Sequence, residues 1–229
     1  MTERLSKKGA LSNEIGKKIN GFCFVICGYF YCVAGSKKAS AASPTVLTIG
    51  SHNGDVWDLQ YRLWQLGYSV SIDGLYGYQT YQAVRKFQSN DGLASDGIVG
   101  YNTWRVLKEK SLSQSEFELL AKLVYSEARG ETYTGQVAVA AVVLNRVDSG
   151  VFPNDVRSVI FQDGAFTAVN DGQFWLSPNQ TARNSALDAI RGWDPSHGAL
   201  YYFNPNTATS SWIWSRPQIV TIGNHIFTK

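Results

Sequence analysis

Apolar residues recur at helical spacing in six segments of the chain. In the first, 54–66, the side chains of Val56, Leu59, Leu63 and Leu66 fall on one face of a predicted helix. The other segments with this pattern are 78–89, 101–108, 115–128, 133–149 and 181–191. Pro153 favours one more short helix after it, because proline suits the first helical turn.

Two later segments, 199–203 and 218–227, are rich in aromatic and β-branched residues and predict strands. The polar segment 204–217 between them predicts a long loop, and the polar segment 108–115 predicts a short linker. The pattern therefore predicts an α+β protein. A three-helix bundle at 45–110 precedes a mostly helical domain at 112–229 that carries a small antiparallel sheet.

The first predicted domain contains an internal repeat. The stretch DGLYGYQTY that begins at Asp73 matches DGIVGYNTW, which begins 23 residues later at Asp96. Each copy predicts a glycine-rich turn that opens a helix, and the two turns can line one shallow groove. Tyr76 and Tyr78 are the candidate exposed aromatic residues of this groove.

The first 41 residues differ in composition from the rest. Four lysines precede an apolar run at 19–35, and Ala39-Ser40-Ala41 follows, which predicts a signal peptide at 1–41 and export of the remainder. An uncleaved membrane anchor is the alternative. This leader holds all three cysteines, seven of the 21 Lys and Arg residues and two of the 18 Asp and Glu residues. The remainder has a net charge of −2, so the basic balance of the whole chain does not indicate nucleic-acid binding.

Two carboxylates, Glu127 and Glu131, lie at the end of an apolar helical run that begins at Leu119. Partial burial disfavours the charged form of a carboxyl group, which makes Glu127 a candidate general acid. The alternative is an ion pair with Arg129 or a solvated helix end. Glu131 is expected mainly to cap the helix that starts near Tyr133, because a carboxylate is favoured at a helix N-terminus.

Segment 54–107 resembles the type 1 peptidoglycan-binding domain. Matching positions include Leu59, Gly67-Tyr68, Phe87-Gln88, Gly92-Leu93 and both Asp-Gly turns. The resemblance implies that peptidoglycan glycan strands are the partner of this domain.

The second domain resembles the SleB/CwlJ cell-wall hydrolase family. The resemblance rests on YSEARGE at 125–131, GQVAVAAVVLNR at 135–146, ALYYFNP at 199–205, and GNH at 223–225. It implies a lysozyme-like, transglycosylase-like fold in which Glu127 is the catalytic acid. It also implies a lytic transglycosylase that cleaves the bond between MurNAc and GlcNAc of spore cortex during germination and leaves 1,6-anhydro-MurNAc ends. The order of leader, binding domain and catalytic domain is that of its spore cortex-lytic members.

Several residues are expected to bind the sugar or to support the acid. Thr167 can hydrogen-bond the acid or a sugar hydroxyl, amides reach hydroxyls, and aromatic faces pack on pyranose rings. The expected substrate-binding residues are Glu131, Phe166, Thr167, Gln173, Tyr201, Tyr202, Asn204 and Trp212. Core packing is the alternative for each aromatic residue, and His225 is expected to be a structural hydrogen-bonding residue.

Three further alternatives concern the reaction and its setting. A hydrolytic muramidase or glucosaminidase would need a second carboxylate, with Glu131, Asp163 and Asp171 as candidates. An inactive wall-binding protein is the non-enzymatic alternative. The three histidines are scattered, so neither a metal nor another cofactor is expected. The resemblance also implies action in the spore cortex, at the outer face of the spore inner membrane, with a YpeB-type partner protein.

Overall fold

The computed structural model describes residues 45–229, which belong to one compact unit. The predicted leader, 1–41, lies outside the described residues. Within them, no helix combines the length and the apolar character that crossing a membrane requires.

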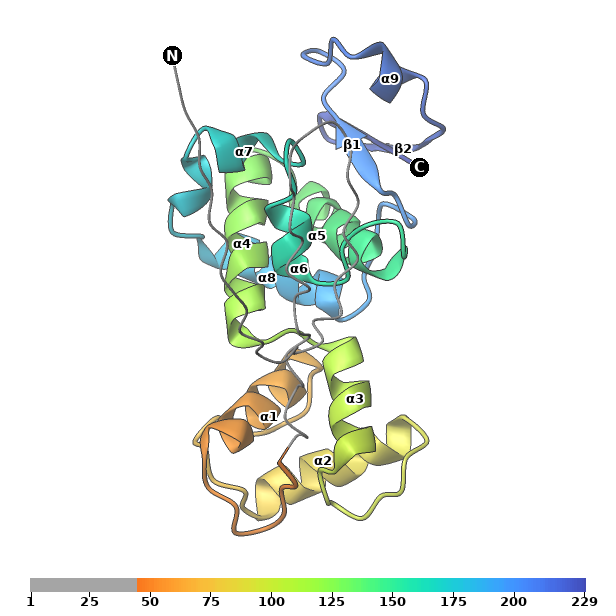
Figure 1. Ribbon diagram of the computed structural model, residues 1–229. Coiled ribbons are helices and arrows are strands. Elements are labelled where there is room, and N and C mark those ends of the chain that lie inside the picture. Colours follow the sequence, from red (N-terminus) through yellow and green to blue (C-terminus); the bar gives the residue numbers. More distant parts are fainter. Residues whose placement is uncertain (1–44) are drawn as a thin grey trace, which may run out of the picture. The chain divides into compact units, whose positions relative to one another are not determined.

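The first part of this unit is a bundle of three helices, α1 (Gly54–Gln65), α2 (Tyr78–Asn90) and α3 (Tyr101–Lys110) (Figure 1). Asn53 caps α1 by accepting a hydrogen bond from the amide of Val56. The apolar faces of the helices enclose a cluster of buried side chains: Leu47, Val56, Leu59, Leu63, Tyr76, Ala83, Val84, Phe87, Val99, Trp104, Val106 and Leu107. The three predicted helices are thus confirmed, with boundaries within two residues of those expected.

The second part begins with two long helices, α4 (Gln114–Ala128) and α5 (Tyr133–Asp148). Ser113 and Glu116 form a capping box at the start of α4, and the Thr132 side chain caps α5. Shorter elements follow as α6 (Val156–Ile160), α7 (Thr167–Asn170), the 3-10 turn η1 (Gln173–Trp175) and α8 (Gln180–Ile190). Helices α4, α5 and α8 pack on one another around a second cluster of buried apolar side chains.

A three-stranded antiparallel sheet completes the fold. Its strands are β1 (Tyr201–Phe203), β2 (Gln218–Ile222) and β3 (His225–Thr228), in the order β1-β3-β2. Tyr202 pairs with Phe227 across β1 and β3. Helix α9 (Ser211–Trp214) lies in the long connection between β1 and β2. The α+β class is confirmed.

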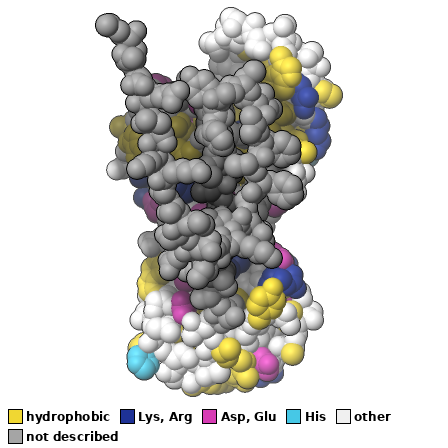
Figure 2. Space-filling model, viewed as in Figure 1, with side chains coloured by type: hydrophobic (Ala, Val, Ile, Leu, Met, Phe, Trp, Pro, Cys, Tyr) yellow, Lys and Arg dark blue, Asp and Glu magenta, His cyan; other side chains and the backbone are white. Residues whose placement is uncertain are grey.

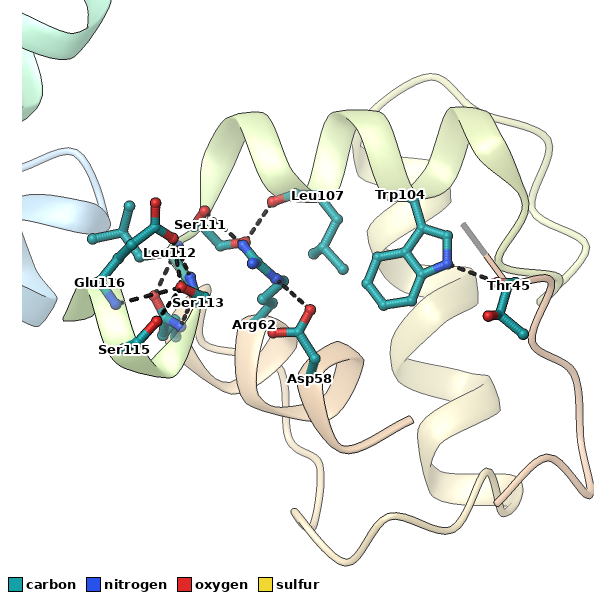
Figure 3. A network of polar contacts seen from close by, with 11 residues as sticks. Thr45, Asp58, Arg62, Trp104, Leu107, Ser111, Leu112, Ser113, Ser115 and Glu116 are labelled. Carbon is teal, nitrogen blue, oxygen red and sulfur yellow. Dashed lines mark hydrogen bonds and ion pairs between the residues drawn. The ribbon is translucent and has the colours of Figure 1, made fainter. Parts of the chain in front are cut away.

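Two predictions of local structure are wrong. The expected single strand 218–227 is a hairpin, because Gly223 adopts a φ of +58° and turns the chain back at Gly223-Asn224. The expected linker 108–115 is mostly helical, since α3 continues to Lys110 and α4 starts at Gln114. The remaining connection is buried at Ser111, whose backbone carbonyl oxygen accepts a hydrogen bond from Arg62 of α1 (Figure 3).

Candidate active site

Glu127 lies in the last turn of α4 and is half-buried. Its Oε1 accepts a hydrogen bond of 2.8 Å from the backbone amide of Ala168 in α7. Its Oε2 lies 3.2 Å from the hydroxyl of Tyr202 in β1, which donates to it. Three elements that are far apart in the sequence therefore meet at this carboxyl group.

The two partners of Glu127 differ in whether they can accept a hydrogen bond. The amide of Ala168 only donates, so Oε1 must be an acceptor in either protonation state. A hydroxyl can donate or accept, so Tyr202 can turn to accept from a protonated Oε2. Burial, with Glu127 nearby, raises the pKa of Tyr202 well above 10, which keeps the hydroxyl proton in place. A proton carried by Glu127 therefore resides on Oε2.

The ion pair between Glu127 and Arg129, which was the alternative to a general acid, does not form in this structure. Arg129 instead donates a 2.6 Å hydrogen bond to Oε1 of Gln173, and its guanidinium lies over the ring of Tyr125. Gln173 in turn donates to Asp171 through its backbone amide and its side-chain amide, both at 2.9 Å. Gln173 thus lies between a cation and a carboxylate, with its side chain half-buried.

The expected helix-capping role of Glu131 is wrong. Thr132 caps α5, whereas the Glu131 carboxylate reaches the β2–β3 turn. Its Oε2 accepts from the backbone amide of Asn224 at 3.0 Å, and its Oε1 accepts from the side-chain amide of Asn224 at 2.9 Å. Helix α4 ends at Ala128, so Glu127 and Glu131 do not share a helical face.

An aromatic pair joins strand β1 to helix α9. Tyr201 packs edge to face with Trp212 at 5.1 Å between ring centroids, and the Arg216 guanidinium lies over both rings. Trp212 is exposed and Tyr201 is half-buried. Trp212 is therefore the ring of this pair that is most open to a ligand.

Phe166 is not available to a sugar. Its ring is buried, and the guanidinium of Arg146 lies 4.9 Å from its centroid. Arg146 is itself buried, also lies over Tyr201, and donates to the carbonyl oxygen of Leu200 at 2.8 Å. Phe166 therefore packs in the core beside Arg146, and its ring is not exposed for the substrate contact expected from the sequence.

Two other expected binding residues have different surroundings. Thr167 is exposed at the start of α7, but the hydrogen bond to Glu127 comes from the backbone of Ala168 and not from the Thr167 side chain. Asn204 is half-buried, and its Oδ1 accepts from the amide of Asn206 at 2.9 Å. Asn204 thus shapes the loop that follows β1.

The structure also contains supporting residues that the sequence did not single out. Ala168 has no polar side chain, so a pattern of residue types could not reveal its amide as a partner of Glu127. Asn224 lies in the GNH motif, but its pairing with Glu131 joins positions 93 residues apart. The motif match at 223–225 was the one signal that pointed to this turn.

The structure of residues 45–229 does not show the hydrogen-bonding role expected for the His225 side chain. The ring is buried, and within residues 45–229 its Nδ1 has no hydrogen-bond partner. The closest carboxylate oxygen, Oε1 of Glu131, is 3.9 Å away. In the same described range, no three His, Cys, Asp or Glu side chains are grouped as metal ligands.

The repeat in the helical bundle has the same hydrogen-bond network twice. In the first copy, the side-chain amide of Gln60 donates to Asp73 at 2.8 Å and its oxygen accepts from the amide of Gly74 at 2.8 Å. In the second copy, Gln88 donates to Asp96 at 3.0 Å and accepts from Gly97 at 2.8 Å. A buried glutamine thus holds each Asp-Gly turn, where glycine has a positive φ.

Each turn is followed by an exposed tyrosine, Tyr78 in the first copy and Tyr101 in the second. A cavity of about 280 Å³ borders the second turn. The part of Figure 2 that contains α1 to α3 shows hydrophobic side chains at the surface among polar ones. Tyr76 is buried, and its hydroxyl donates to the carbonyl oxygen of Gly97 at 2.7 Å, so its expected exposure is wrong.

Two family models match the chain. Residues 130–228 match the Cell Wall Hydrolase family, and residues 52–107 match a peptidoglycan binding domain family. The first match begins three residues after Glu127 and includes Glu131, Tyr202 and His225.

Whole proteins and a solved structure are also similar. A spore cortex-lytic enzyme of Bacillus cereus is 45% identical over 84% of this chain and 90% of its own length. One of Oceanobacillus iheyensis is 42% identical over 90% of this chain and 96% of its own length. The catalytic domain of the germination-specific lytic transglycosylase SleB of Bacillus anthracis is 64% identical, with a TM-score of 0.50, over 52% of this chain and 97% of that domain. With matches that span almost the full length of such relatives, the chain belongs to the family of spore cortex-lytic enzymes.

Proposed function

We propose that this chain is a lytic transglycosylase that cleaves the glycan strands of spore cortex peptidoglycan, with Glu127 as both general acid and general base. The observation that carries the proposal is the pair of contacts at Glu127, whose Oε1 accepts from a fixed amide and whose Oε2 faces the Tyr202 hydroxyl. This arrangement leaves one defined atom, Oε2, from which a proton can be transferred.

The reaction proceeds in two balanced steps. Protonated Oε2 gives its proton to the oxygen of the glycosidic bond between MurNAc and GlcNAc, and the bond from C1 of MurNAc to that oxygen breaks. The C6 hydroxyl of the same MurNAc then forms a bond to C1, and its proton passes to the Glu127 carboxylate. The enzyme is regenerated and the product ends in 1,6-anhydro-MurNAc. Once the Oε2 proton has left in the first step, the Tyr202 hydroxyl donates a hydrogen bond to the carboxylate at Oε2.

This reaction needs no second carboxylate, because no water is activated. Two of the candidates for such a second group are engaged elsewhere. Glu131 accepts both hydrogen bonds of Asn224, and Asp171 accepts two from Gln173. Hydrolysis by a muramidase or glucosaminidase would require one of them, or Asp163, to hold a water opposite the bond.

The proposed substrate contacts follow from exposure and chemistry. Tyr201 and Trp212 offer aromatic faces to pyranose rings, and Gln173, Thr167 and Asn204 offer polar groups to sugar hydroxyls. The domain at 112–229 carries this site. The domain at 45–110 holds the chain on peptidoglycan through its two repeated turns and their exposed tyrosines.

We further propose that residues 1–41 direct export, that the enzyme acts in the spore cortex at the outer face of the spore inner membrane, and that a YpeB-type protein is its partner. The resemblance of the leader to a signal peptide supports export. Recovery of the chain outside the inner membrane, shortened at Ala41, is the expected result in spores. A full-length chain in the cytoplasm would contradict it.

The deciding experiment is cleavage of purified cortex in oxygen-18 water, followed by mass spectrometry of the released muropeptides. Transglycosylation yields unlabelled anhydro ends, whereas hydrolysis yields labelled reducing ends that are heavier by one water. E127Q keeps the shape of the side chain and removes the transferable proton, so we expect activity to fall by roughly 10²–10⁴-fold. Labelled reducing ends would contradict the transglycosylase assignment. An active E127Q would show that another residue is the general acid.

A further inference from the structure

The Glu131 carboxylate is held in a pocket that leaves it little freedom. Its side chain is 9% exposed, and both of its oxygens accept hydrogen bonds from Asn224. A Cβ at Gly223 would collide with its Oε2, so the turn needs glycine for the close approach as well as for its positive φ. On the other side, a Cβ at Gly135 of α5 would lie only 3.1 Å from the Cβ of Glu131.

The turn that Glu131 holds continues directly into the strand beneath Tyr202. His225, the residue after Asn224, places its ring edge to face with the Tyr202 ring at 5.1 Å between centroids. Phe227, two residues later, pairs with Tyr202 in the sheet register. The Tyr202 ring therefore rests on β3, and its hydroxyl reaches Oε2 of Glu127.

The charges around this turn are also defined. Burial alone would raise the pKa of Glu131, but the two hydrogen bonds from Asn224, with His225 nearby, hold it below its usual value of 4.5. Burial lowers the pKa of His225 below 6.5, although Glu131 and Glu127 act in the opposite direction. At neutral pH Glu131 is thus a carboxylate beside a neutral imidazole, and its lasting partner is Asn224.

We propose that Glu131 is a positioning residue for Glu127. By holding the Gly223-Asn224 turn, it fixes β3, and β3 fixes the Tyr202 hydroxyl at Oε2. Glu131 itself does not exchange protons with the sugar. This inference rests on the proposed function of Glu127, and its test is chosen so that the two can fail separately.

The test exchanges the polarity of the Glu131–Asn224 pair. In E131Q, the introduced amide N–H group faces an N–H group of Asn224, so one of the two hydrogen bonds is lost and two donors oppose each other. In E131Q/N224D, the introduced amide oxygen accepts from the backbone amide of residue 224 and the introduced N–H group donates to the new carboxylate, so that two hydrogen bonds and one negative charge are restored. Activity on soluble cortex glycan strands is measured well below the unfolding midpoint of each variant.

We expect E131Q to lower kcat about 10-fold or more with KM changed less than about twofold, and E131Q/N224D to regain most of the loss. In a Y202F background, E131Q should lower kcat less than about twofold further, because residues that act through one contact are not additive. A wild-type kcat in E131Q, no regain in the exchanged pair, or fully additive effects would each overturn the inference. E127Q is measured in parallel: its activity would overturn the proposed function, whereas an inactive E127Q beside a fully active E131Q would overturn only the role of Glu131.

Discussion

The two oxygens of the Glu127 carboxyl group have hydrogen-bond partners of different chemical type. Oε1 of Glu127 is bonded to the backbone amide of Ala168, which cannot accept, and Oε2 is bonded to the Tyr202 hydroxyl, which can. The sequence indicated Glu127 as a candidate acid and Tyr202 as a candidate substrate-binding residue, without a link between them. Only the folded structure brings the Ala168 amide to Oε1 and the Tyr202 hydroxyl to Oε2.

We predict that Y202F lowers kcat. The substitution keeps the ring on β3 but removes the hydroxyl, so Oε2 loses a hydrogen bond to a charged group. Such a bond contributes about 1.5–3 kcal/mol, which corresponds to a loss of roughly 10- to 100-fold in kcat. Turnover of soluble cortex glycan measures it. Y133F is the matched control, because the Tyr133 hydroxyl donates to Asp188 and not to Glu127; equal losses in the two variants would contradict the assignment.

Among the elements, the β2–β3 hairpin carries the turn that pairs with Glu131. The aromatic and β-branched residues of 218–227 predicted one strand, but the turn at Gly223-Asn224 divides it into β2 and β3, and β3 lies at the centre of the sheet. The short elements α7 and η1 were also not predicted, since four and three residues are too few to show a period. Yet α7 supplies the amide at Glu127, and Gln173 of η1 binds Arg129.

The hairpin gives the stability of the protein a defined pH dependence. Because the pKa of His225 lies below 6.5 in the folded chain, the unfolded chain binds more protons between that lowered pKa and 6.5. Stability therefore rises with pH through this window and is lost as the pH falls below about 6.5. The lowered pKa of Glu131 adds a second loss in the same direction as the pH falls below 4.5.

We therefore expect H225F to reduce the drop in unfolding midpoint between pH 7 and pH 5.5, as measured by thermal unfolding at each pH. The introduced ring still packs on Tyr202 and Phe227 but does not bind a proton. H52Q is the control, because His52 is exposed and lies in the other part of the chain. The same pH dependence in H225F and in wild type would show that His225 is not responsible.

Across the described molecule, hydrogen bonds join the helical bundle to the helices that carry the site. The Arg62 guanidinium is buried and donates to the carbonyl oxygen of Ser111 and to Asp58, both at 2.9 Å (Figure 3). The side chain of Gln65 pairs with the backbone of Leu112, and Arg191 donates to the carbonyl oxygen of Gln65 at 2.8 Å. The Tyr61 ring of α1 also packs on Phe117 of α4.

We predict that R62A lowers the free energy of unfolding by about 1–3 kcal/mol, because it leaves the buried Ser111 carbonyl oxygen without this partner. Urea unfolding followed by circular dichroism measures the loss. R105A removes an exposed i,i+4 ion pair with Glu109 and should change stability by no more than about 0.5 kcal/mol. If R62A were as stable as R105A, the junction would contribute nothing measurable to the fold.

The sequence by itself indicated most of the regular elements and the candidate acid, Glu127. Helical periods in α1 to α5 and α8 and the repeated Asp-Gly turns depend on neighbours a few positions apart, and local patterns reveal such neighbours. The motif around Glu127 identified the candidate acid for the same reason, because its residues are contiguous.

Only the tertiary structure decided which groups form hydrogen bonds with Glu127 and with the residues that support it. The long-range partners of Glu127, Glu131 and Arg62 lie 41 to 93 residues away in the sequence, and three of these contacts are made by backbone groups that almost any residue could provide. Burial likewise depends on what packs against a residue: it made Tyr76 and Phe166 core residues although their types suit a sugar site. Contacts of this kind arise from the folded arrangement of elements, so no local pattern of residue types encodes them.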